Sequence, residues 1–135
     1  MPKPFPFITA HSGCMSMPDN TLASAERGLK LGADVFEDDV RITRDGILVL
    51  AHNDIVHLPD GTEYSISEND YRDLCELSIV AAHGTETIRL ATLESFLQFI
   101  KASGKIANLD LKVDECITAV SDLVQKYGMM DQVVI

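Results

Sequence analysis

The chain has 135 residues and a formal net charge of −10, from 21 acidic and 11 basic residues. This length suits one domain, so we treat residues 1–135 as a single unit. Hydrophobic residues make up 46% of the sequence, which is enough for a folded core and excludes a disordered chain. The acidic balance and the lack of a Lys/Arg run exclude a surface that binds nucleic acid.

The N-terminus and the cysteines indicate the compartment. The opening MPKPFPFITA holds three prolines and lacks the apolar core of a signal peptide. No apolar run approaches the ~20 residues of a membrane span. Cys14, Cys75 and Cys116 are widely spaced and form no CxxC pair, which argues against a disulfide framework. We therefore expect a cytoplasmic protein with reduced thiols and no transmembrane segment.

Short apolar runs alternate with segments of helical period. Residues 7–10 form the first apolar run, which ends at His11. Leu22, Ala25 and Leu29 then share one face of a predicted helix. Residues 35–40 mix apolar and acidic side chains. Residues 47–51 are continuously apolar, as is typical of a strand that is buried on both faces of a parallel sheet.

The second half of the chain repeats this alternation. A polar stretch from residue 53 to about residue 67 is expected to be a loop. The remaining elements are a helix from Ser67 or Asp70 toward Leu77, a helix from Thr92 to near Gly104, a strand at Ile106–Leu111, a helix along residues 117–127 and a final strand at residues 133–135.

The alternation of strands and helices predicts an α/β fold with a parallel sheet. A doubly wound sheet and a (β/α) barrel both fit this pattern. In either architecture, functional residues lie at the carboxyl ends of the strands. No glycine-rich nucleotide-binding motif is present in the sequence.

Several acidic residues fall at or near these strand ends. Glu37 and Asp39 lie in the second predicted strand, and Asp110 lies in the fourth. Because the side chains of a strand alternate, Glu37 and Asp39 point to one face and Asp38 to the other. Three hard oxygen donors in one concavity match Mg²⁺ or Ca²⁺. A bound cation would also let this acidic chain accept an anionic substrate.

Two histidines complete the predicted site. His11 follows the first strand and His52 follows the third, while Lys112 shares a strand face with Asp110. Two imidazoles on either side of a phosphodiester supply a base and an acid near neutral pH. His57 and His83 have no such surroundings, and we interpret them as surface residues.

These motifs occur in a recognisable order along the chain. They are ITAHSG, PDNT, GADVFEDDV, TRDG, LVLAHND, ATLESFL, NLDLK and the final QVVI. The ordered set resembles the glycerophosphodiester phosphodiesterase family. That resemblance implies a (β/α)8 TIM barrel, of which this chain covers about the first half: four βα units and the start of a fifth strand.

The resemblance also implies site roles. His11 and His52 would be the acid–base pair, and Glu37, Asp39 and Asp110 would hold Mg²⁺ or Ca²⁺. Lys112 would bind phosphate, with Ser12 beside it in the place of the usual Arg. The implied reaction hydrolyses glycerophosphodiesters to an alcohol and glycerol 3-phosphate, through attack by a substrate hydroxyl and a cyclic phosphate.

Departures from the family pattern leave alternatives open. Ser12, Asp19, Asn53 and Asp110 each replace another residue, and these changes concern the substrate more than the chemistry. One alternative is a related phosphodiesterase with a lysophospholipid-type substrate. Another is a truncated, catalytically inactive half barrel that acts as a structural fragment. Open strand edges would then favour a homo-oligomer.

Overall fold

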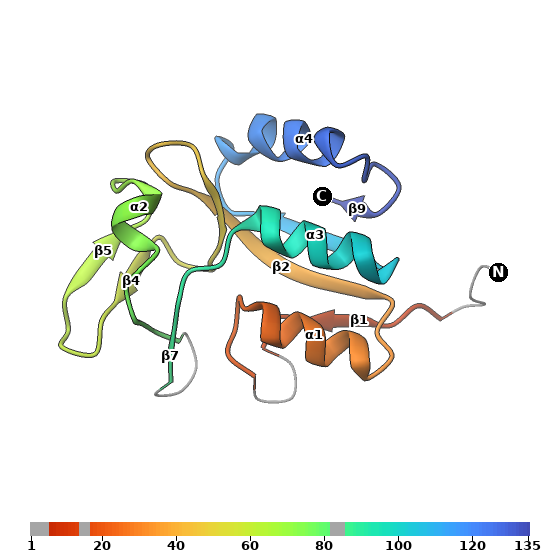
Figure 1. Ribbon diagram of the computed structural model, residues 1–135, viewed down its shortest axis with the longest axis horizontal. Coiled ribbons are helices and arrows are strands. Elements are labelled where there is room, and N and C mark those ends of the chain that lie inside the picture. Colours follow the sequence, from red (N-terminus) through yellow and green to blue (C-terminus); the bar gives the residue numbers. More distant parts are fainter. Residues whose placement is uncertain (1–5, 14–16, 82–85) are drawn as a thin grey trace.

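Parallel strands brought together from distant parts of the chain form the centre of the molecule (Figure 1). The computed structural model describes residues 6–13, 17–81 and 86–135. Its main sheet has the order β1-β2-β8-β9, and each neighbouring pair in this path is parallel. The bounds of these strands are Thr9–His11, Val35–Ile42, Ile106–Leu111 and Val133–Val134.

Three helices connect the parallel strands, and their ends carry the residues that the sequence led us to expect. They are α1 (Leu22–Lys30), α3 (Leu93–Ser103) and α4 (Cys116–Lys126). The hydroxyls of Thr21 and Thr92 cap α1 and α3 by accepting backbone hydrogen bonds three residues on, each at 3.1 Å. Gly104 ends α3 at a φ of 70°, a left-handed conformation that glycine adopts without strain.

The main core lies between these helices and one face of the sheet. Phe36 and Val40 of β2 and Leu109 of β8 are buried there. They pack with Leu97 of α3 and Val120 of α4, among other residues of the same cluster. Side chains of α1 join the same core. The opposite face of β2 is therefore left to the alternating residues Glu37 and Asp39.

The direction expected for one strand was wrong. Residues 47–51 were expected as a third parallel strand, but β3 (Leu48–Leu50) runs antiparallel to the end of β2. The reason is the connection, because only a few residues around Gly46 separate the two strands. A parallel crossover needs a dozen or more residues, whereas an antiparallel hairpin needs very few. The sheet thus holds four parallel strands in the described chain, and residues 133–134 form the fourth rather than the fifth.

β3 is apolar for another reason than its place in a parallel barrel. All three of its residues are buried, as expected. Leu48 and Leu50 belong to the main core, whereas Val49 and Ala51 belong to a second apolar cluster. The strand therefore separates two cores.

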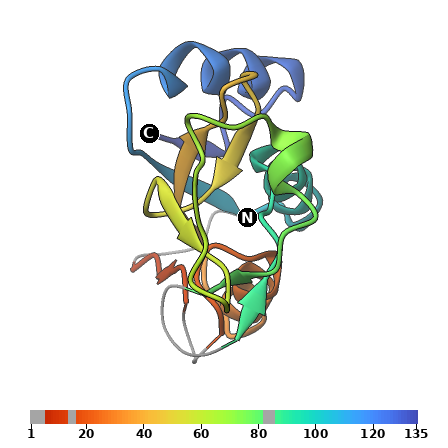
Figure 2. The ribbon, with the colours of Figure 1, turned by 90° about the vertical axis from the view of Figure 1, so that its left-hand side faces the viewer.

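The second cluster belongs to an insertion between β3 and α3. This insertion lies to the left of the helices in Figure 1 and faces the viewer in Figure 2. Its elements are β4 (Ile55–His57), β5 (Glu63–Ser65), α2 (Tyr71–Leu74), β6 (Ile79–Val80) and β7 (Thr87–Ile88). Hairpin β4–β5 lies where a loop was expected, and α2 ends before Leu77. Ile66, Leu74 and Leu90 are buried at its centre.

The remaining sequence expectations concern thiols and membranes. Cys75 and Cys116 are free thiols. Cys14 and His83 lie outside the described residues, and His57 is exposed. Within the described ranges, no helix has the length and apolar character needed to cross a bilayer.

Candidate active site

A pocket of about 490 Å³ brings together residues from β1, β2, β8 and the segment after β3. It contains every site residue expected from the sequence except Ser12. The residues that line it are His11, Asp19, Glu37, Asp39, His52, Asn53, Asp110 and Lys112.

Strand register explains why these side chains meet. His11 and Glu37 are Cα partners in the β1–β2 pair. Asp39 and Asp110 are Cα partners in the β2–β8 pair. Partners in adjacent parallel strands project to the same face, and residues two apart on one strand do as well. The sheet thus places these residues on the face that the main core leaves open.

Three carboxylates converge in this pocket. Glu37, Asp39 and Asp110 each offer an oxygen atom, and these atoms lie within 4.8 Å of one another. The side chain of Asp39 is only 6% exposed. One carboxylate oxygen of Glu37, Oε2, is buried and accepts no hydrogen bond. An unsatisfied buried oxygen beside two more carboxylates fits a hard divalent cation.

Burial shapes the chemistry of Glu37. Loss of solvent is the main reason that the pKa of its carboxyl is raised. His11 Nε2 lies 2.9 Å from Glu37 Oε2. That contact lacks hydrogen-bond geometry, so it acts as an electrostatic attraction when His11 is protonated. A bound cation would stabilise the same carboxylate more directly.

Lys112 supplies a positive charge among the carboxylates. Its ammonium donates to Asp110 Oδ2 at 2.8 Å and lies 3.3 Å from Asp39 Oδ1. The hydrogen bond to Asp110 is the main reason that the pKa of Lys112 is raised. The ammonium therefore compensates the negative charge of two of the three carboxylates in this cluster.

Hydrogen bonds orient both imidazoles. The carbonyl oxygen of Ser12 lies 2.8 Å from His11 Nδ1 and can only accept, so Nδ1 carries the proton. This bond is the first cause of the raised pKa of His11. His52 Nδ1 lies 3.0 Å from Asn53 Oδ1, and Arg41 donates to the carbonyl of His52 at 3.0 and 2.9 Å. These hydrogen bonds engage Nδ1 of each ring, while Nε2 of His11 faces Glu37 Oε2 at 2.9 Å.

Ser12 does not line the pocket. It is 5% exposed, and its hydroxyl accepts a hydrogen bond from the backbone N–H of Asn20 at 2.5 Å. The sequence led us to expect a substrate contact by this side chain, but the structure places it outside the pocket lining. Its hydroxyl fixes the segment after β1, and its carbonyl orients His11.

Sequence reasoning missed the part played by Asn20. Its Nδ2 donates to Asp38 Oδ1 at 2.6 Å and to Asp39 Oδ2 at 3.2 Å. Asn20 has a φ of 58°, a left-handed conformation that Asn tolerates better than most residues. The available signal was the PDNT motif, which contains Asn20 and directly precedes the predicted first helix.

Asp38 lies on the face opposite to Glu37 and Asp39, as its alternation along the strand predicted. It is fully buried, and loss of solvent raises the pKa of its carboxyl to about 7. Hydrogen bonds from Asn20 and from the Asp39 N–H oppose that rise. Asp38 thereby ties the segment after β1 to β2 behind the pocket.

Comparison with known proteins now adds to this geometry. The model of the glycerophosphoryl diester phosphodiesterase family matches residues 11–133. The chain belongs to this family. A glycerophosphodiester phosphodiesterase from Caldanaerobacter subterraneus subsp. tengcongensis is 29% identical over 108 residues, which are 78% of this chain and 44% of that protein. These findings confirm the resemblance carried by the sequence motifs.

Solved structures of glycerophosphodiester phosphodiesterases share the fold. The enzyme from Agrobacterium tumefaciens str. C58 matches with a TM-score of 0.78 and 22% identity, over 96% of this chain and 56% of that one. A phosphodiesterase from Oleispira antarctica, in complex with the product sn-glycerol-3-phosphate, matches with a TM-score of 0.72 and 26% identity, over 90% of this chain and 52% of that one. The chain thus spans about half the length of its relatives, which confirms a partial (β/α)8 barrel.

Proposed function

We propose that the protein carrying this chain hydrolyses glycerophosphodiesters to an alcohol and glycerol 3-phosphate. The observation that supports this most directly is the shared pocket of about 490 Å³, which is lined by two histidines, four carboxylates, an asparagine and a lysine. Membership of the family and the names of the relatives point to the same reaction. The product bound in the Oleispira antarctica structure has the expected glycerol phosphate part.

In the proposed chemistry each imidazole exchanges a proton at Nε2, and the reaction begins with one ring neutral and the other protonated. One histidine takes the proton of a glycerol hydroxyl as that oxygen attacks phosphorus. The other gives a proton to the alcohol oxygen as its bond to phosphorus breaks. The cyclic phosphate that results is then opened by water with the two roles exchanged. Paired acid–base groups of this kind each contribute typically ~10²–10⁴-fold to a rate.

The carboxylates would hold the ion that this reaction requires. Glu37, Asp39 and Asp110 would be its ligands, and Mg²⁺ and Ca²⁺ both favour such oxygen donors. When bound, the ion supplies positive charge for the phosphoryl oxygens. Lys112 adds charge from the same side of the pocket and helps to bind the phosphate.

The test is turnover of glycerophosphocholine by the intact protein with Mg²⁺ or Ca²⁺ present. His11→Ala and His52→Ala are each expected to leave below about 1% of the rate. His83→Ala, at a histidine outside every matched motif, serves as the control and is expected to keep the rate. Near-normal turnover in either of the first two variants would refute the two-histidine mechanism. An inactive intact protein would favour the alternative of a structural half barrel.

A further inference from the structure

A second cavity adjoins the candidate active site. It measures about 370 Å³ and shares Asp19, His52 and Asn53 with the first pocket. Because these three residues line both cavities, a molecule with its phosphate at His52 can extend from one into the other.

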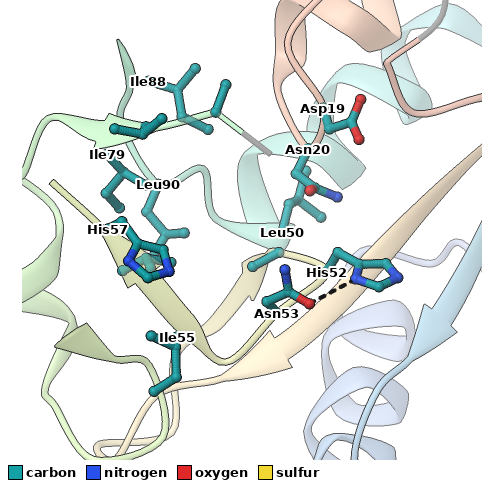
Figure 3. A pocket seen from close by; sticks show the side chains of 14 residues that line it. Asp19, Asn20, Leu50, His52, Asn53, Ile55, His57, Ile79, Ile88 and Leu90 are labelled. Atoms are coloured by element: carbon teal, nitrogen blue, oxygen red, sulfur yellow. Dashed lines mark hydrogen bonds between the residues drawn. The ribbon is translucent and has the colours of Figure 1, made fainter. Parts of the chain in front are cut away.

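The second cavity is apolar over most of its wall. Figure 3 shows Ile79, Ile88 and Leu90 on one side, with Ile55 below them, and Asp19, Asn20, His52 and Asn53 on the other side. Leu50, Ala51, Val56, Val80 and Ala81 add aliphatic side chains to the wall, and His57 adds an imidazole beside Ile79 and Leu90. The cavity therefore has a polar end at the active site and an end within the insertion that is aliphatic except for His57.

The insertion is built to hold this wall in place. Ile79 and Ile88 are Cα partners in the β6–β7 hairpin, so their side chains lie together on one face. Ile79 and Leu90 are 4% and 6% exposed and belong to the second apolar cluster. Ile55, in contrast, is 43% exposed although it lines the cavity. The cavity thus offers buried aliphatic walls and the accessible side chain of Ile55 to an apolar group.

We propose that this cavity is a subsite for an aliphatic chain carried by the phosphodiester substrate. The proposal rests on the proposed function and narrows its substrate class. The aliphatic chain extends from the phosphate at His52 between Ile55 and the Ile79–Ile88 pair, where it replaces water. A water-soluble head group without such a chain leaves the apolar end of the cavity empty.

The aliphatic chain could come from either of two parts of the substrate, and the test separates these two sources. An acyl or alkyl group on the glycerol gives a lysophospholipid-type diester, and an alkanol on the other side of the phosphate gives a glycerophosphoalkanol. The intact protein is assayed with both series, each with methyl, butyl, hexyl and octyl chains. Burial of each methylene is worth ~0.8 kcal/mol, so kcat/KM is expected to rise by roughly two- to fourfold per methylene in one series.

Variants of exposed isoleucines provide the control. Ile55→Ser removes part of the cavity wall, so it is expected to reduce the dependence of kcat/KM on chain length. Ile117→Ser changes an isoleucine on α4 that is 54% exposed and lies outside the cavity. That variant is expected to keep the full dependence on chain length. An equal loss in both variants would contradict the subsite.

The outcomes distinguish a failed subsite from a failed function. Hydrolysis of the methyl substrates without any gain from longer chains would overturn the subsite and leave the proposed function intact. If no diester is hydrolysed, the proposed function fails, and binding decides the subsite. Calorimetry with ethyl, butyl, hexyl and octyl phosphates is then expected to give affinities that increase with chain length and depend on Ile55. Equal affinities for the short and long alkyl phosphates would refute the subsite.

Discussion

The ammonium of Lys112 lies between the carboxylates of Asp39 and Asp110, at 3.3 and 2.8 Å. This lysine therefore holds two of the candidate ligands together. A divalent cation that binds the same oxygen atoms must share them with a positive neighbour. Lys112 thus has opposite effects, since it organises the site and also opposes the ion.

Replacement of Lys112 by methionine is expected to strengthen cation binding. Removal of one positive charge near the ion, in a partly solvated pocket, is worth ~1 kcal/mol, or about fivefold in affinity. Calorimetric titration with Mg²⁺ and Ca²⁺ measures the change. Lys30→Met removes an exposed lysine on α1 and serves as the charge-matched control. Weaker binding in Lys112→Met than in the control would mean that the lysine mainly orders the ligands.

Replacement of Glu37 by glutamine is expected to weaken the binding of Mg²⁺ and Ca²⁺. The amide keeps the size of the side chain but removes a charged donor whose Oε2 is buried without a hydrogen bond. We expect a loss on the order of 10- to 100-fold, at least as large as that caused by losing a ligand's supporting partner. Glu26→Gln, on an exposed part of α1, is the control. Identical weak binding by all three proteins would remove the proposed metal site.

The raised pKa of Asp38 is expected to make the free energy of unfolding depend on pH. Burial raises its pKa to about 7 in the folded chain, from an ordinary value near 4. The folded chain then holds a proton that the unfolded chain releases, so this group stabilises the fold at low pH. That contribution is lost as the pH rises from about 4 to about 7.

The Asp38→Asn variant isolates this effect. It keeps an acceptor for the hydrogen bonds from Asn20 and the Asp39 N–H. The free energy of unfolding of the variant, relative to wild type, is expected to rise by a few kcal/mol between pH 4 and pH 7. Urea unfolding in the presence of a chelator measures it, with Asp122→Asn as a charge-matched control on α4. A constant difference across this range would contradict a proton held by Asp38.

Gly28 provides a test of packing between α1 and the sheet. A Cβ at this position would lie 2.9 Å from the Ala10 Cβ and 3.1 Å from two ring atoms of Phe36. Gly28→Ala is therefore expected to cost ~1–3 kcal/mol through overpacking, which outweighs the ~1 kcal/mol that alanine gains in a helix. Denaturant unfolding gives the sign. Ala23→Gly, at an exposed position of α1, measures the effect of helix propensity alone. A stabilised Gly28→Ala would show that α1 can move away from the sheet.

The sequence predicted the residues of the pocket better than the path of the chain. Alternation along β2 placed Glu37 and Asp39 on one face, and Ile106–Leu111 was predicted with its observed bounds. The direction of β3 was missed because an apolar run looks alike in a parallel strand and in one that lies between two cores. The short hairpins of the insertion have strands of two or three residues, which are too short to show a period.

Hydrogen bonds between residues that are distant in the sequence could not be predicted from it, for a different reason. The carboxylate–amide contact of Asn20 with Asp38 depends on a left-handed backbone at Asn20, which composition does not specify. The burial of Ser12 likewise follows from how the segment after β1 folds back on itself. Motif order identified the residues of the site, whereas the hydrogen bonds that orient them required the structure.

The position of β3 between two clusters divides the site by local stability. Among the described residues, the main core holds fifteen buried apolar side chains and the insertion core holds seven. Regions with fewer buried contacts open more often in native proteins, which amide hydrogen exchange detects. Such an opening of the insertion would displace His52, which follows β3, while β1, β2 and β8 stay paired. The protein would then spend part of its time in a state that keeps its carboxylates assembled but lacks one of its two imidazoles.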